Sequence, residues 1–161
     1  MDTIKILDWT IEIDREKTIE YYNSMPYVKE LCECENCVNF EKACESINDE
    51  VRELFNKLGI DIKKSQELFY CMDNDDGTCL YWAFCDIIGN IIQGKDCIIT
   101  DKIEENKETN LSEIFISHPV LIPYIEGFNI GFNKRQYLEY SGIKYEAICL
   151  QFEGVFKRVI Y

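Results

Sequence analysis

The sequence predicts an α+β fold, in which an N-terminal strand and two to three helices pack on a mainly antiparallel β-sheet. Three observations support this prediction. Helix signals are concentrated before residue 60, apolar and polar residues then alternate with a period of two, and short turns rich in Asp, Asn and Gly separate the alternating segments. Strands joined by short turns are antiparallel, and helices grouped early in the chain can cover one face of their sheet.

The N-terminal segment combines a strand signal with a helix start. Apolar and acidic side chains alternate up to Asp14, which predicts a half-buried strand. Asp14 is suited to cap a helix from Arg15 to about Asn23, and the run Ser24-Met25-Pro26 ends that helix. The side chains expected to face the core are Leu7, Trp9, Ile11 and Ile13.

The clearest helix runs from Asn48 to Leu58. Asn48 can cap it, acidic residues occupy the first turn, and Gly59 follows the last turn. A preceding helical region is expected from Val38 to beyond Cys44. The apolar stripe expected to face the core is Val51, Leu54, Phe55 and Leu58.

The second half of the chain reads as strands. The alternating run 68–72, the turn Asp73–Gly77 and the segment 79–86 predict a hairpin. The turn does not fit a calcium loop, because placing Gly77 at loop position 6 puts Ala83 where a bidentate Glu is required. Further strands are expected at 91–92, 97–100, 111–117, 128–132, 147–152 and 155–161, with Glu153-Gly154 as the turn between the last two.

Length and charge limit the classes of partner. The 161 residues contain no repeat and no linker, which predicts a single domain over residues 1–161. There are 30 acidic and 17 basic residues, for a formal net charge of −13. This charge repels phosphate backbones and anionic lipids, so we expect no nucleic acid and no membrane partner. A basic protein or a metal cation fits the charge better, although excess acid also simply favours solubility.

The N-terminal residues predict a cytoplasmic protein. The segment 1–6 has no basic region followed by a long apolar run, so no secretory signal is expected. The nine cysteines should then be reduced, and an odd number cannot all pair within the chain.

One cysteine cluster stands out, Cys32-x-Cys34-x-x-Cys37 with Cys44 on the following helix. A Cys-x-x-Cys turn directs two thiolates at one point, as in zinc knuckles. Cys32 can add a third sulfur and Cys44 a fourth, which predicts a tetrahedral zinc site. The alternative is a set of reduced thiols without metal, in which the buried ones act as small apolar side chains.

Thiol chemistry is a second alternative for the cluster. A Cys-x-x-Cys pair at a helix start can be redox-active when the helix N-terminus stabilises the first thiolate. Glu33, Glu35 and Glu41 surround the cluster, however, and we expect their negative charge to raise the thiol pKa values. This argues against redox use.

No residue is singled out as catalytic. His118, the only histidine, precedes Pro119 at the end of an expected strand and lies in no cysteine-nucleophile signature. The glycines at 127 and 131 form neither a phosphate loop nor a dinucleotide fingerprint. We therefore expect a domain without enzymatic activity.

The run Cys32–Phe40 (CECENCVNF), the helix start Asp14-Arg15-Glu16-Lys17-Thr18 and the stretch Leu58-Gly59-Ile60-Asp61 resemble a family of small Gram-positive bacterial proteins. That family is a domain of unknown function with a C-x-C-x-x-C-x-N-[FY] motif, and the resemblance covers the first half of the chain. It implies no activity. It does imply that the three motif cysteines, Asn39 and Phe40 form one structural unit. The family pattern does not include Cys44, Cys71, Cys79, Cys85, Cys97 or Cys149.

The residues after the cluster favour an architectural role. Asn39 can cap the following helix or bind the backbone of the turn, and Phe40 can anchor the turn in the core. We therefore expect a structural cysteine turn that binds zinc or no cofactor. The alternative function is an acidic immunity or inhibitor protein that covers a basic protein partner.

Overall fold

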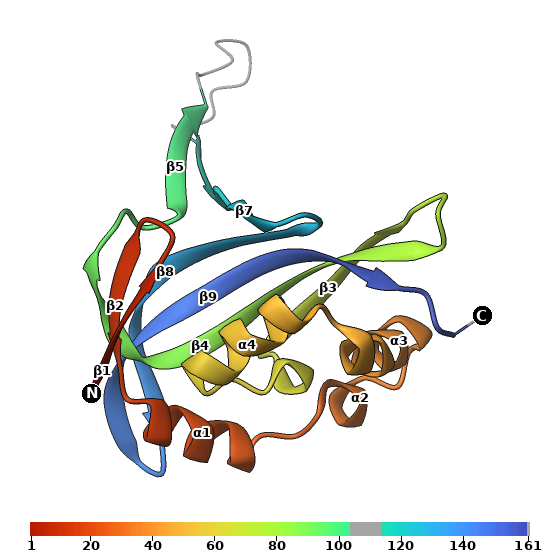
Figure 1. The fold of residues 1–161 in the computed structure, drawn as a ribbon. Helices are drawn as coiled ribbons and strands as arrows, with labels where there is room; N and C mark the ends of the chain where they lie inside the picture. The colour runs from red at the N-terminus through yellow and green to blue at the C-terminus, as the bar shows by residue number, and fades with distance from the viewer. Residues whose placement is uncertain (104–113, 161) are drawn as a thin grey trace.

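The computed structural model describes residues 1–103 and 114–160 (Figure 1). Its strands form a sheet in the order β1-β2-β4-β9-β8-β7, with β3 paired to β4, and a separate two-stranded sheet of β5 and β6. All of the pairings are antiparallel, which confirms the predicted fold class. The elements are β1 (Asp2–Ile6), β2 (Trp9–Ile13), α1 (Arg15–Ser24), α2 (Val28–Leu31), α3 (Glu35–Ala43), η1 (Cys44–Ser46), α4 (Asp49–Leu58), η2 (Ile62–Lys64), β3 (Glu67–Asp73), β4 (Thr78–Gln93), β5 (Ile98–Ile103), β6 (Ile114–Pro119), β7 (Ile122–Ile125), β8 (Phe128–Tyr140) and β9 (Ile143–Lys157).

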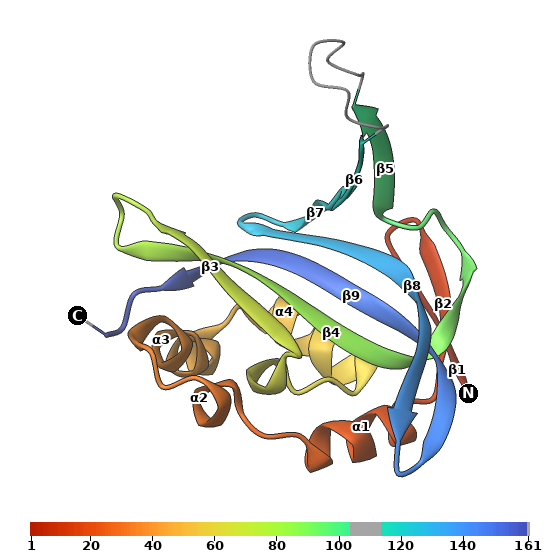
Figure 2. The ribbon, with the colours of Figure 1, turned by 180° about the vertical axis from the view of Figure 1, so that it is seen from behind.

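The helices cover one face of the large sheet, and the β5–β6 hairpin projects from the opposite side (Figures 1 and 2). The core lies between the helices and the sheet. Phe55 of α4 packs edge-on against Phe152 of β9, with ring centroids 5.4 Å apart, and Phe40 of α3 packs on Tyr81 of β4 at 5.2 Å. In the first part of β4, every second residue faces this core and is fully buried: Cys79, Tyr81, Ala83, Cys85 and Ile87.

The two helices with capping signals begin as predicted. Asp14 Oδ1 accepts a hydrogen bond from the N–H of Lys17 at 3.0 Å, and Asn48 Oδ1 accepts one from Glu50 N at 2.8 Å. Gly59 ends α4 with a left-handed φ of +76°. The predicted apolar stripe of α4 is buried: Val51, Leu54, Phe55 and Leu58.

The predicted N-terminal strand is present as β2, but it is the second strand of a hairpin, and β1 was not predicted from the sequence. Leu7 lies in the turn with φ +51° and is exposed, rather than facing the core. The other three predicted core residues, Trp9, Ile11 and Ile13, are buried in β2. Strand β1 buries its own alternate side chains, Ile4 and Ile6, and the period-two pattern shifts by one residue across the turn, which leaves Leu7 outside the core.

The predicted turn at Glu153-Gly154 was also wrong, because β9 runs through it without interruption. A Cβ at Gly154 would lie 2.6 Å from Cδ2 of Phe128 on the neighbouring strand, so glycine is required there for close packing rather than for a turn. The turns that enter and leave β8 carry Gly127 and Gly142, both with positive φ.

The remaining strand predictions differ from the structure mainly in their bounds. The hairpin of β3 and β4 with its turn at 73–77 is present, and the expected strand 91–92 is the end of β4. The expected strand 111–117 overlaps β6, and its residues 111–113 lie outside the described part of the chain. No helix among the described residues is long and apolar enough to cross a membrane.

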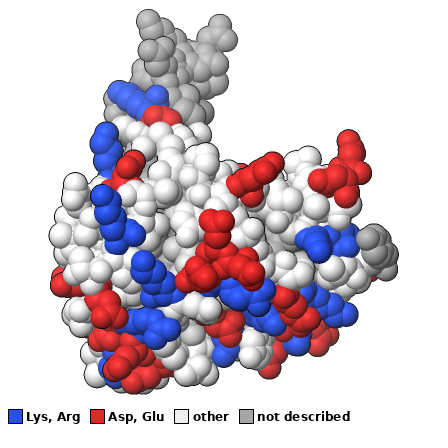
Figure 3. All heavy atoms as spheres, in the orientation of Figure 1, with Lys and Arg blue, Asp and Glu red and all other residues white. Residues whose placement is uncertain are grey.

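The surface of the helical side is strongly charged. Figure 3 shows the molecule in the orientation of Figure 1, with α4 toward the viewer. Acidic side chains gather near the centre of this face, and basic side chains lie beside them. Asp49, Glu50 and Glu53 of α4 are exposed.

Candidate metal centre

The three motif cysteines lie at the corner between two helices. Cys32 caps the C-terminus of α2, Cys34 is the N-cap of α3, and Cys37 is in the first turn of α3. The helix therefore begins at Glu35, three residues earlier than the sequence predicted. The Cys-x-x-Cys spacing thus joins an N-cap residue to the third helical residue. These two positions lie side by side at any helix start, as in a capping box.

The sulfur atoms of Cys32, Cys34 and Cys37 all lie within 4.8 Å of one another. The sulfurs of Cys32 and Cys34 are 3.2 Å apart. Zn–S bonds of about 2.3 Å in a tetrahedral site hold neighbouring sulfurs about 3.8 Å apart. Small side-chain rotations would therefore bring the three sulfurs to bonding distance of a single ion.

Cys44, the fourth predicted ligand, is not part of this group of sulfurs. It begins the short helix η1, and its side chain is buried in the main core. Burial also raises the pKa of its thiol. The structure thus brings together three of the four predicted ligands.

The helix start changes the expected electrostatics of the cluster. The sulfur of Cys34 makes no capping hydrogen bond of standard geometry. Even so, the backbone N–H of Cys37, followed by the thiol of Cys32, lowers the pKa of Cys34. Burial and the neighbouring sulfurs of Cys32 and Cys34 raise the pKa of Cys37 to about 12. The expectation that the acidic residues would raise every thiol pKa was wrong for Cys34, because backbone N–H groups at a helix N-terminus stabilise an anion at contact distance.

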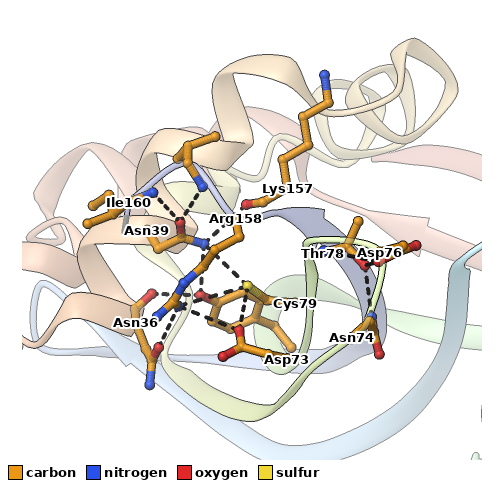
Figure 4. A network of polar contacts seen from close by, with 12 residues as sticks. Asn36, Asn39, Asp73, Asn74, Asp76, Thr78, Cys79, Lys157, Arg158 and Ile160 are labelled. Atoms are coloured by element: carbon orange, nitrogen blue, oxygen red, sulfur yellow. Dashed lines mark hydrogen bonds and ion pairs between the residues drawn. The ribbon is translucent and has the colours of Figure 1, made fainter.

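Asn39 fixes the helix that carries Cys37 to the rest of the molecule (Figure 4). It is fully buried, and its Oδ1 accepts hydrogen bonds from the backbone N–H groups of Val159 at 2.8 Å and Ile160 at 3.1 Å. Its Nδ2 donates to the hydroxyl of Tyr81 at 3.1 Å and to the carbonyl of Lys157 at 3.2 Å. Asn39 therefore binds the C-terminal segment, not the cysteine turn or its own helix start.

The same network reaches the residue next to Cys37. The carbonyl of Asn36 accepts a hydrogen bond from the Tyr81 hydroxyl at 2.9 Å, and its side-chain oxygen accepts one from Nη1 of Arg158 at 2.8 Å. Phe40 is fully buried and packs on Phe156 at 5.0 Å as well as on Tyr81. Sequence reasoning missed Tyr81 and Arg158, which are far from the motif along the chain and carry no local signal.

His118 lies away from the cysteine turn. It is on β6, in the hairpin that projects from the side of the sheet opposite the helices (Figure 2). Its Nδ1 is 3.6 Å from Oδ2 of Asp101, and both side chains are substantially exposed.

We compared the chain with protein-family models, with curated proteins and with solved structures, and none of the three comparisons found a match. The resemblance to the Gram-positive family therefore stays a prediction, and the site is interpreted from its own geometry.

Proposed function

We propose that Cys32, Cys34 and Cys37 bind one zinc ion, which holds the corner between α2 and α3 and has no catalytic role. The observation that carries the proposal is the convergence of three sulfur atoms within 4.8 Å. Thiolates are soft ligands that select zinc over calcium or magnesium, and an exposed site leaves room for water as the fourth ligand.

The local structure gives such an ion something to stabilise. Helix α2 has only four residues, and a helix of that length is not stable by itself. Lys29 of α2 pairs with Glu41 of α3, with Nζ 2.9 Å from Oε1. A metal bound by Cys32 on one side and by Cys34 and Cys37 on the other would provide a second link between the two helices.

Elemental analysis tests the proposal on protein purified without chelator or affinity metal. We expect close to one equivalent of zinc, and less than about a tenth of an equivalent would contradict metal binding. The variant Cys37→Ser should lose the metal. The matched control Cys71→Ser, at an exposed cysteine outside the cluster, should retain it.

Cobalt substitution tests the ligand set separately. A site with three thiolates should show sulfur-to-cobalt charge-transfer absorption and the intense visible bands of tetrahedral cobalt. The variant Cys44→Ala should leave this spectrum unchanged if three cysteines suffice. If Cys44→Ala lost these bands, Cys44 would be the fourth ligand after all.

A second candidate function follows from charge. The net charge of −13, with exposed acids on α4, favours an immunity or inhibitor protein that covers a basic protein partner. A pull-down at low and at moderate salt tests this function. We expect a basic partner at low salt, weakened by the double variant Glu50→Gln and Glu53→Gln. The absence of any partner at low salt would count against it.

A further inference from the structure

Four side chains from four adjacent strands form a row on the sheet face opposite the helices. The strand registers place Phe69 opposite Trp82, Trp82 opposite Glu153, and Glu153 opposite Asn129. Directly opposed residues of antiparallel strands share a face of the sheet. The neighbours of Trp82 along β4 are buried on the helical side, so this row lies on the outer side.

A pocket lies at this row, beside the base of the projecting hairpin. Its volume is about 460 Å³, which is within the usual range for sites that bind small molecules. Strand β6 and the loop after it supply one wall, and the row supplies the floor. The lining residues are Trp82, His118, Pro119, Leu121, Asn129 and Glu153.

The wall is anchored to the sheet, so the pocket is largely formed in advance. The N–H of Cys97 donates to the carbonyl of Phe132 at 2.8 Å, and the N–H of Val120 donates to the carbonyl of Cys97 at 2.7 Å. Gly131 allows this close approach, because a Cβ there would lie 2.7 Å from Cβ of Cys97.

The chemistry of the lining favours a cation. Among the described residues, Glu153 is the only acidic one in the lining, and the lining contains no Lys or Arg. Within the same part of the chain, Oε1 of Glu153 accepts one hydrogen bond, from Nδ2 of Asn129 at 3.2 Å. The ring of Trp82, with Phe69 packed beside it at 5.3 Å, offers the aromatic surface to which cations bind. Asp101, next to His118, adds a further negative charge nearby.

We propose that this pocket binds the guanidinium or ammonium group of an organic cation. The cation would donate to the free oxygen of Glu153 and lie against the ring of Trp82. This inference is independent of the proposed zinc site. The same chemistry can come from a free small molecule or from an arginine or lysine side chain of a peptide.

Calorimetric titration of the full chain with N-acetyl-L-arginine amide tests the proposal. The uncharged isostere N-acetyl-L-citrulline amide serves as the matched probe on the same wild-type protein. We expect saturable binding of the arginine probe and roughly tenfold or weaker affinity for the citrulline probe, because only the former pairs with a carboxylate. Equal affinities, or no binding of the arginine probe up to about 10 mM, would overturn the proposal.

Variants assign the binding to this pocket. Glu153→Gln should weaken the arginine probe roughly tenfold, whereas the control Glu139→Gln, which removes the same charge at an exposed position on β8, should change affinity less than about twofold. If the two variants lowered the affinity for the arginine probe equally, only net charge would matter, and binding at this pocket would be contradicted. Unchanged thermal unfolding of both variants verifies that each is folded.

Tryptophan emission reports on the pocket directly. The chain has two tryptophans, and Trp9 is buried with its indole N–H bonded to the carbonyl of Lys95. The emission change caused by the arginine probe should therefore disappear in Trp82→Phe; its persistence would place binding elsewhere.

A comparison of two ligands distinguishes the two sources of the cation. Tighter binding of agmatine than of the tripeptide Gly-Arg-Gly would indicate that the ligand is a free small molecule. Tighter binding of the tripeptide would indicate a side chain of a peptide.

Discussion

Asn39 joins three parts of the chain that are far apart in sequence. From α3 its side chain reaches the Tyr81 hydroxyl on β4 and the backbone of residues 157–160. All of its hydrogen-bonding groups are buried, so each lost partner would leave an unsatisfied polar group in the interior.

Replacing Asn39 should therefore be costly. We expect Asn39→Ala to lower the free energy of unfolding by about 2–4 kcal/mol, because the backbone N–H groups of Val159 and Ile160 lose their acceptor and the buried hydroxyl of Tyr81 loses a donor. Urea denaturation measures the loss. The control Asn23→Ala, at an exposed position of α1, should change stability by less than about 0.5 kcal/mol. A similarly small effect of Asn39→Ala would show that the hydrogen bonds of Asn39 to the C-terminal segment contribute little to stability.

Asp86 is a second residue whose environment the sequence does not reveal. Its carboxylate is buried and pairs with Arg135, with Nε 2.9 Å from Oδ1. Burial raises the pKa of Asp86 and the charge of Arg135 opposes that rise, with a net shift upward from the ordinary 3.8. The folded state therefore binds the proton more tightly than the unfolded state does.

This shift predicts a pH dependence with a definite sign. As the pH rises from about 4 through the raised pKa, the unfolded chain loses its proton first, so the contribution of Asp86 to stability falls. The free energy of unfolding of wild type relative to Asp86→Asn should accordingly decrease between about pH 4 and pH 7, as measured by denaturation at each pH. The exposed-site variant Asp8→Asn should not remove this slope. A flat difference between wild type and Asp86→Asn would contradict the assignment.

At the scale of elements, β9 shows how a glycine can mislead a sequence reading. Gly154 lies within the strand, near its C-terminal end, where the rings of Phe128 and Phe156 leave no room for a Cβ. Glu153-Gly154 resembles the Asp-Gly and Asn-Gly pairs of hairpin turns, and a glycine inside a strand can instead mark close packing. The rings that decide the matter belong partly to another strand.

Gly154→Ala should thus destabilise the protein by about 1–3 kcal/mol through overpacking. Chemical denaturation measures the change. In the background of Phe128→Leu the same substitution should cost clearly less, because the smaller side chain vacates the position that the new methyl group needs. Equal costs in the two backgrounds would show that the cause is not contact with Phe128.

The helices were predicted better than the strands, for a local reason. The caps at Asp14 and Asn48 and the αL glycine at Gly59 act within a few residues, so the sequence carries them directly. The start of α3 was missed because Cys34 is an unusual N-cap residue and has no strong capping signal. That error also hid the effect of the helix N-terminus on its pKa.

At the scale of the whole molecule, the excess of acidic residues is the dominant property. A net charge of −13 on a chain of 161 residues produces self-repulsion, which opposes the compact state and is screened by salt. Basic side chains interspersed among the acids on the helical side relieve it only locally (Figure 3).

Salt should therefore stabilise this protein. Raising NaCl from about 20 mM to about 500 mM should increase the temperature of thermal unfolding, since the Debye length falls from about 20 Å to about 4 Å. KCl at equal ionic strength should act alike. The double variant Asp8→Lys and Asp75→Lys, at two exposed positions, should show a smaller increase because its net charge is less negative. An unfolding temperature that is independent of salt would contradict the importance of self-repulsion.

The sequence by itself determined the fold class, the helix caps, the hairpin at 73–77 and the spacing that brings Cys34 and Cys37 together, because each depends on residues within a few positions of one another. Only the tertiary structure decided that Cys44 lies apart from the three-sulfur cluster, that Asn39 binds the C-terminal segment, and that Trp82, Glu153 and Asn129 line one pocket. Those outcomes depend on strand order and register, which pair residues across distances that no local pattern encodes.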